Sequence, residues 1–189
     1  MDLWEAIESR RSVRHFTDEP VERRDIERLL HAAAQAPSAM NSQPWRFHVC
    51  TGESRARVGE IVSQATVHLV DYMDVLGPEH YEEASAWYAS LGNAPVVIGV
   101  SSPVPCTEFD SMNKMLSVGA AIENLMLSAT AQGLGACSVT FVVWARDELA
   151  ELFRLEEDHE VVGIIALGHP APGSGPAVVK NEDVADWLG

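Results

Sequence analysis

The sequence predicts one domain in which helices cover both faces of a four-stranded sheet. The chain has 189 residues, enough for a single core that buries about 70% of the unfolded surface. Four segments have the composition of strands, and helical patterns separate them: 45–50, 95–101, 136–140 and 160–167. Parallel and antiparallel pairing both remain open. We find no repeat or interdomain linker, so we expect one domain over residues 1–189.

The N-terminal part predicts two helices and a polar loop. Asp2 and Glu5 have capping-box spacing for a short helix that runs through Ile7. A second helix begins near Val21 and ends before Pro37. Its apolar positions are Ile26, Leu29, Leu30 and Ala33. Residues 37–44 are turn formers, and such a loop can offer amides and hydroxyls to a ligand before the strand at 45–50 begins.

The remaining segments alternate helix and strand. Apolar spacing predicts a helix over 58–69 and a second, with Trp87 and Tyr88, over 79–91. The buried strand at 95–101 precedes the longest helical pattern, 112–132, which Gly133 ends. Small residues on the early turns of that helix permit close approach of another helix, which suits a central or subunit-interface position. The strand at 136–140, a helix at 146–155, the strand at 160–167 and a tail rich in Gly and Pro complete the chain.

Charge and cysteine content restrict the partners and the compartment. With 13 basic and 28 acidic residues the net charge is −15, which disfavours nucleic acid and anionic membranes. The most apolar run, 117–136, is interrupted by polar residues and predicts a core helix. Cys50, Cys106 and Cys137 form no C-x-x-C pair, and no signal peptide precedes the first helix pattern. We therefore expect a cytoplasmic protein with reduced thiols.

Three arginines and a serine gather at residues 10–14, a local cationic segment in an acidic chain. If the segment is extended, Arg10, Ser12 and Arg14 share one side, and the two arginine α-carbons lie about 13 Å apart. Arginine grips phosphate through two hydrogen bonds, so a phosphorylated ligand is the first hypothesis. A solvated basic turn is the alternative.

Other motifs are missing or misplaced. Gly133-Leu134-Gly135 closes a helix and precedes a strand, the reverse of a dinucleotide fingerprint, and is better explained as a helix cap. Walker A, H-E-x-x-H and G-x-S-x-G patterns do not occur, and the seven histidines have no ligand spacing, so we expect no metal. A phosphate grip without a protein nucleophile or metal cluster suggests that a bound cofactor performs the chemistry.

Five motifs together resemble the FMN-dependent nitroreductase family. They are R-R-S-V-R-H-F at 10–16, A-P-S-A-M-N-S-Q-P-W-R-F at 36–47, A-P-V-V-I at 94–98, E-N-L-M-L-S-A-T-A-Q-G-L-G-A-C at 123–137 and I-A-L-G-H-P at 165–170. The motifs follow the family's order and cover nearly the whole chain. The resemblance implies an α+β fold with a central mixed, largely antiparallel sheet. It also implies a homodimer with two FMN sites at the subunit interface, each built from both chains.

The resemblance assigns the flavin contacts residue by residue. Arg10, Arg11 and Ser12 match the contacts to the phosphate, and Arg14 matches the cation beside the N1/O2 edge of the ring. Lys180 matches a tail cation that returns to the phosphate.

Two further segments match contacts to the flavin ring. The loop that the partner chain places against the ring corresponds to Pro37, Ser38, Asn41 and Gln43. The segment whose backbone lies on the N5/O4 edge corresponds to Val139, Thr140 and Phe141. Many relatives carry W-I-G where this chain has Ser138-Val139-Thr140, so packing beside the ring differs.

The resemblance implies an oxidoreductase in which flavin N5 carries the hydride and no side chain acts as a catalyst. NADH or NADPH reduces FMN and leaves, and a nitroaromatic, quinone or related small acceptor then replaces it. One alternative is a flavin-dependent dehydrogenase or oxidase of a small or peptide-derived substrate, and another is a flavin-binding protein without turnover. The choice of nicotinamide, the physiological substrate, the pocket segments at 66–92 and 103–110 and the role of Cys106 remain open.

Overall fold

A computed structural model describes residues 1–72, 77–173, 180–181 and 183–188. The helices are α1 (Leu3–Ser9), α2 (Arg23–Ala34), α3 (Gly52–Ala65), α5 (Pro78–Ser90), α6 (Glu108–Ala131) and α7 (Arg146–Phe153). The strands are β1 (Arg46–Thr51), β2 (Val96–Pro103), β3 (Gly135–Val139) and β4 (His159–Gly168). Short 3-10 turns cover Ala39–Asn41, Thr66–Tyr72, Leu91–Asn93 and Phe141–Ala145.

The four strands form one sheet in the order β1-β2-β4-β3, and each neighbouring pair is antiparallel. A bulge between Val100 and Ser101 shifts the register of β2 against β4. Within the described ranges, the one parallel pairing is an isolated bridge between Ser12 and Ala136. The expected α+β fold with a largely antiparallel sheet is confirmed, and β3 lies at an edge of that sheet.

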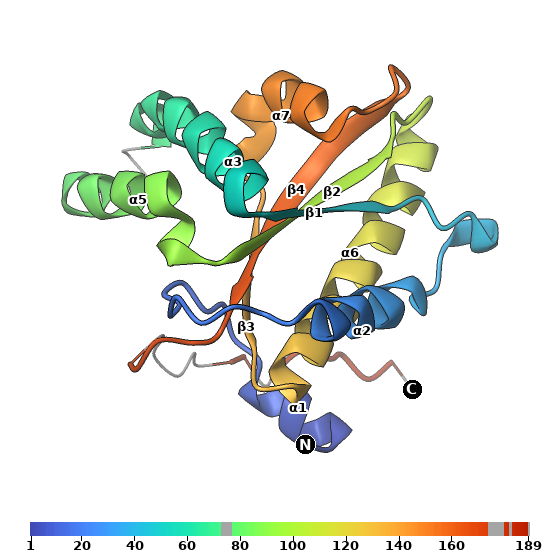
Figure 1. Cartoon of the computed structure of the whole chain (residues 1–189). Helices are drawn as coiled ribbons and strands as arrows, with labels where there is room; N and C mark the ends of the chain where they lie inside the picture. The colour runs from blue at the N-terminus through green and yellow to red at the C-terminus, as the bar shows by residue number, and fades with distance from the viewer. Residues whose placement is uncertain (73–76, 174–179, 182, 189) are drawn as a thin grey trace.

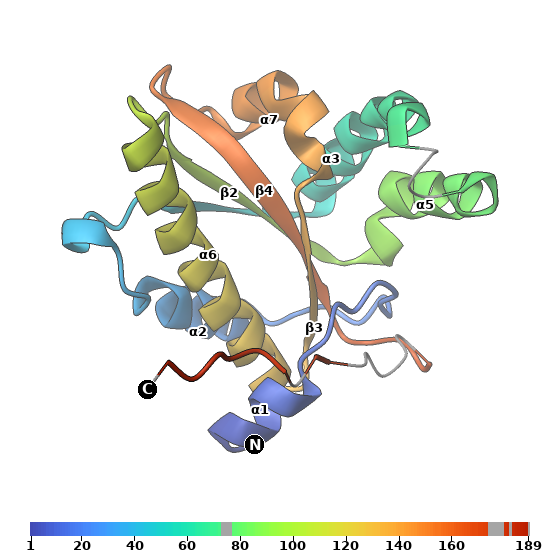
Figure 2. The ribbon, with the colours of Figure 1, turned by 180° about the vertical axis from the view of Figure 1, so that it is seen from behind.

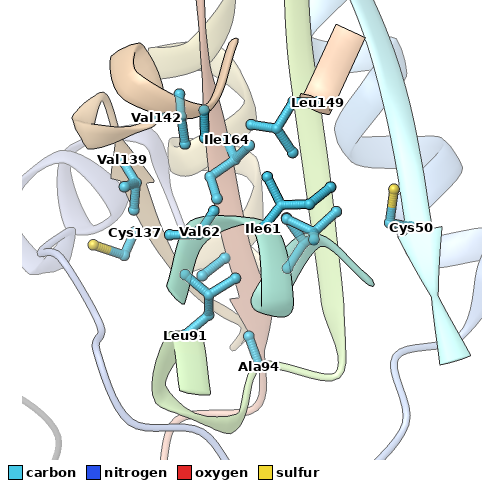
Figure 3. Packing of buried hydrophobic residues seen from close by; sticks show 14 of the residues in the cluster. Cys50, Ile61, Val62, Leu91, Ala94, Cys137, Val139, Val142, Leu149 and Ile164 are labelled. Carbon is cyan, nitrogen blue, oxygen red and sulfur yellow. The ribbon is translucent and has the colours of Figure 1, made fainter. Parts of the chain in front are cut away.

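Alternating side chains of β2 and β4 divide the core into two layers, because successive residues of a strand face opposite sides. Val97 and Ile164 pack with α3 and α7, whereas Ile98 and Ile165 pack with α2 and α6. Figures 1 and 2 show α3, α5 and α7 grouped on one side of the sheet and α2 and α6 on the other. Figure 3 shows the first layer, in which Ile61, Val62 and Leu149 surround Ile164. The predicted helices therefore do cover both faces.

α3 begins at Gly52 instead of 58, the largest difference from the predicted boundaries, and α6 begins at Glu108 instead of 112. Thr107 caps this helix, and its side chain accepts a hydrogen bond from the Asp110 N–H at 3.1 Å. Polar residues surround Phe109 in the first turn, so the apolar pattern was recognised only from Met112 onward. In the part of the chain that the structure describes, we find no helix with the length and apolar character needed to cross a membrane.

Candidate active site

The arginine segment follows α1 directly and runs along the free edge of β3. α1 ends at Ser9, and Arg10 leaves it with φ −58° and ψ 131°. Ser12 pairs in parallel with Ala136, and the Val13 N–H donates to the Ala136 carbonyl at 3.0 Å. The segment is therefore extended, which is the conformation that puts Arg10, Ser12 and Arg14 on one side.

Gly135 allows this close approach. A Cβ at Gly135 would lie 2.7 Å from the Cβ of Val13, too close for two carbon atoms. Val13 is buried, so burial of its side chain holds the extended segment against β3. Arg14, the next residue, is exposed and borders a cavity.

The three arginines differ in their partners. Arg10 Nε lies 2.7 Å from Glu123 Oε1 on α6, so this ion pair leaves the two Nη groups of Arg10 for an anion. Among the residues that the structure describes, Arg11 and Arg14 have no acidic partner. Two guanidinium groups of this acidic chain thus have no acidic partner in its described part, which suits an anionic ligand.

A cavity of about 1050 Å³ lies beside this segment. Arg14 and His15 form one part of its wall, the end of β3 and the following turn form another, and α5 forms a third. Aromatic rings meet there: the Tyr88 and Phe141 centroids are 4.4 Å apart, and those of Phe141 and Trp144 are 5.0 Å apart. The cavity therefore combines a cation with flat apolar surfaces, which suits a planar anionic molecule.

At the end of β3, a backbone N–H is directed to the side of the strand where the arginine segment lies. Because the Ala136 carbonyl points outward to Val13, alternation directs the Val139 carbonyl inward, to β4. The N–H of a trans peptide points opposite to the preceding carbonyl, and no described peptide is cis. The Thr140 N–H is therefore directed outward at the free edge, and Thr140 lines the cavity.

Burial and Arg14 act in opposite directions on two acidic groups of the cavity. Burial raises the pKa of the Tyr88 hydroxyl and that of the Cys137 thiol. The charge of Arg14 partly opposes both increases, and a hydrogen bond with Ser12 further lowers the pKa of Cys137.

The structure brings together only part of the predicted site. Of the predicted residues, Arg14, Val139, Thr140 and Phe141 line the cavity, and Ser138, which was not predicted, lines it as well. Lys180 is exposed and is not among the lining residues, and residues 174–179 before it lie outside the described ranges.

The loop assigned to the partner chain also lies outside the cavity of its own chain. It is held internally: the Gln43 N–H donates to Ser38 Oγ at 2.9 Å, and Gln43 Nε2 lies 3.3 Å from Asn41 Oδ1. Pro37 is exposed at its start.

Sequence patterns missed three contributions to the site. Trp87 and Tyr88 stand in a segment whose pocket shape was left open, although two adjacent aromatic residues on an amphipathic helix were a usable signal. Trp144 lies in the unpredicted 3-10 turn Phe141–Ala145. The pairing of Arg10 with Glu123 had no local signal, because the two residues belong to different elements.

Several known proteins are similar to this chain over most of its length. The model of the nitroreductase family matches residues 7–169. A putative NADH dehydrogenase/NAD(P)H nitroreductase of Archaeoglobus fulgidus is 31% identical over 168 residues, which cover 87% of this chain and 83% of the relative. Nitrobenzene nitroreductase of Ectopseudomonas oleovorans is 27% identical over 190 residues, and the match covers 86% of this chain and 84% of the relative. A substituted form of the FMN- and NADPH-dependent nitroreductase NfnB from a Sphigopyxis strain is 27% identical, with a TM-score of 0.81 over 100% of both chains.

Proposed function

Because the chain belongs to the nitroreductase family, we propose that it is an FMN-dependent oxidoreductase that passes electrons from NADH or NADPH to a small acceptor. One observation carries the proposal: the unpaired Arg14 and the outward Thr140 N–H border one aromatic cavity. A cation, a backbone donor and flat apolar walls are the groups that an anionic flavin needs. The residues present therefore fit FMN.

The two ends of the site would bind different parts of FMN. Arg10, Arg11 and Ser12 would hold the phosphate, with Glu123 orienting Arg10 through Nε and leaving its Nη groups for the anion. Lys180 would add a third positive charge to that end. Arg14 would stand beside the N1/O2 edge of the ring.

The ring side combines electrostatics with exclusion of water. FMN supplies the hydride chemistry when bound. The Arg14 guanidinium would stabilise negative charge on the ring, and the backbone N–H groups of Thr140 and Phe141 would donate to its N5/O4 edge. Tyr88 and Trp144 offer aromatic surface to a planar substrate and keep water away from it.

The site is completed, in this proposal, by a second copy of the chain. Met40, Asn41 and Gln43 have φ of 53°, 55° and 47°, a left-handed conformation that is costly for residues other than glycine. Met40 is 98% exposed at the tip of this loop. A rigid, exposed loop with polar side chains is suited to reach the partner's flavin.

An exposed apolar stripe on α6 supports the same assembly. Phe109, Met112, Met115 and Leu116 follow helical spacing, and each exposes more than half of its surface. A homodimer that buries this stripe would also bring the Ala39–Asn41 turn near the partner, since Ala39 is bound to α6 through Ser117 Oγ at 3.2 Å.

Turnover is proposed to be ping-pong, since one cavity receives the nicotinamide and then the acceptor. Nitroaromatics and quinones are the proposed acceptors. The visible spectrum of the purified protein and anaerobic titration with each nicotinamide test the assignment. Reduction by NADH or NADPH followed by reoxidation with a nitroaromatic supports it. Bound FMN that neither nicotinamide reduces would instead indicate a dehydrogenase of another substrate or a flavin-binding protein.

The phosphate assignment has its own test. Arg11→Ala should weaken FMN binding roughly ten- to a hundredfold, because a charged hydrogen bond contributes about 1.5 to 3 kcal/mol. Riboflavin lacks the phosphate and should bind both proteins equally. Arg57→Ala, which removes an exposed cation paired with Glu60, is the control and should leave FMN affinity unchanged. Equal losses for FMN and riboflavin would contradict the assignment.

A further inference from the structure

We infer that Trp87 is a positioning residue for Arg14: its indole N–H holds the backbone of the arginine that faces the cavity. Trp87 Nε1 donates to the Arg14 carbonyl at 2.6 Å across a sequence separation of 73 residues. This bond joins α5 to the cationic segment, and both elements line the cavity. The inference rests on the proposed function where it concerns FMN, but the positioning itself is a property of the chain.

The backbone after α5 is shaped to support this bond. Leu91, Gly92 and Asn93 have φ of 47°, 62° and 61°, three successive residues in the left-handed region. We call Leu91–Asn93 the left-handed corner. The Leu91 side chain is fully buried, which offsets the cost of its backbone conformation, and Gly92 accepts a hydrogen bond from the Phe16 N–H at 3.0 Å.

Gly92 leaves just enough room for the contact. A Cβ on Gly92 would lie 1.8 Å from the Arg14 carbonyl oxygen and 2.9 Å from Trp87 Nε1. The corner, the indole and the arginine backbone are therefore packed directly against one another. A strained, over-determined backbone of this kind at the wall of a site is typical of preorganisation.

Arg14 needs such a support because its side chain has no acidic partner among the described residues. An ion pair would hold the guanidinium in one place, but it would also neutralise the charge that a ligand needs. Holding the backbone on both sides leaves the charge free. Three hydrogen bonds hold this backbone: from the Val13 N–H to Ala136, from the Trp87 indole N–H to Arg14, and from the Phe16 N–H to Gly92.

The first test uses the apoprotein and does not depend on FMN. Trp87→Phe removes the donor and keeps an aromatic ring against Tyr88, whose centroid lies 5.2 Å from that of Trp87. If Trp87 positions Arg14, the variant moves the cation away from Cys137, and the pKa of that thiol rises toward its value in Arg14→Gln. The pKa is measured from the pH dependence of peptide-resolved alkylation, with Cys50 as the internal reference. Trp45→Phe, on the other side of the sheet, should change neither thiol.

The second test uses the loaded protein. Trp87→Phe should weaken binding of reduced FMN roughly three- to tenfold more than binding of oxidised FMN, the effect of losing one hydrogen bond that holds the cation. In an Arg14→Gln background, Trp87→Phe should not further change the ratio of the Kd for reduced FMN to the Kd for oxidised FMN.

The outcomes separate the two proposals. An unchanged Cys137 pKa in Trp87→Phe, or equal weakening of both FMN forms, would overturn the positioning role. A wild-type protein that binds no FMN would instead overturn the proposed function, and the apoprotein test would still decide the role of Trp87.

Discussion

Gly92 offers a direct test of the packing between the left-handed corner and the arginine segment. In Gly92→Ala the new methyl group would lie 1.8 Å from the Arg14 carbonyl oxygen, about half of an ordinary contact distance. The corner must therefore move away by more than 1 Å, a shift of roughly the difference between those two distances. Such a shift breaks the bonds from Trp87 to Arg14 and from Phe16 to Gly92.

The expected loss follows from these contacts. A left-handed alanine costs about 1 to 2 kcal/mol, and each of the two lost hydrogen bonds costs about 0.5 to 1.5 kcal/mol. The free energy of unfolding should therefore fall by about 2 to 5 kcal/mol, measured by urea denaturation. FMN affinity should fall as well, because the backbone of Arg14 is displaced.

Gly133→Ala is the matched control. Gly133 has φ +77°, and a Cβ there would meet nothing within 4 Å. This variant should lose only the backbone term of about 1 to 2 kcal/mol and should bind FMN like the wild type. The reasoning is refuted if both variants lose equal stability, or if folded Gly92→Ala keeps the wild-type FMN affinity.

Two other predictions address the ring edge and the second copy. Thr140→Pro deletes the outward N–H and should slow reduction of the flavin and lower the flavin's reduction potential, because an unpaired buried acceptor costs about 1 to 3 kcal/mol. Thr140→Ala keeps the N–H and should stay near wild type. Stopped-flow reduction of folded, FMN-replete protein measures this, and an equal loss in both variants would show that the backbone donor is not the contact. Met115→Asp places a charge in the exposed stripe of α6 and should abolish dimer and bound FMN together. Sedimentation with a flavin absorbance trace checks it, and a monomer with stoichiometric FMN would contradict the composite site.

Much of the fold could be predicted because its signals are local. Alternating and continuous apolar runs located all four strands, since burial on one or both faces of a sheet constrains neighbouring residues directly. Boundaries were less certain where polar capping residues carry the information, as at Thr107 before α6. The pairing of strands is a contact between distant segments, and only the resemblance to a family indicated that it is antiparallel.

The sequence by itself determined which residue types the site can use. The cluster of arginines at 10–14 is cationic whatever its conformation, and its charge in an acidic chain already indicated an anionic ligand. The tertiary structure decided what each of them does. Arg10 meets Glu123, whereas Arg14 has no acidic partner among the described residues, borders a cavity, and accepts a hydrogen bond from Trp87 at its carbonyl. Periodicity records burial along one element, but a hydrogen bond between elements depends on how closely they pack, and here the missing side chain of Gly92 sets that distance.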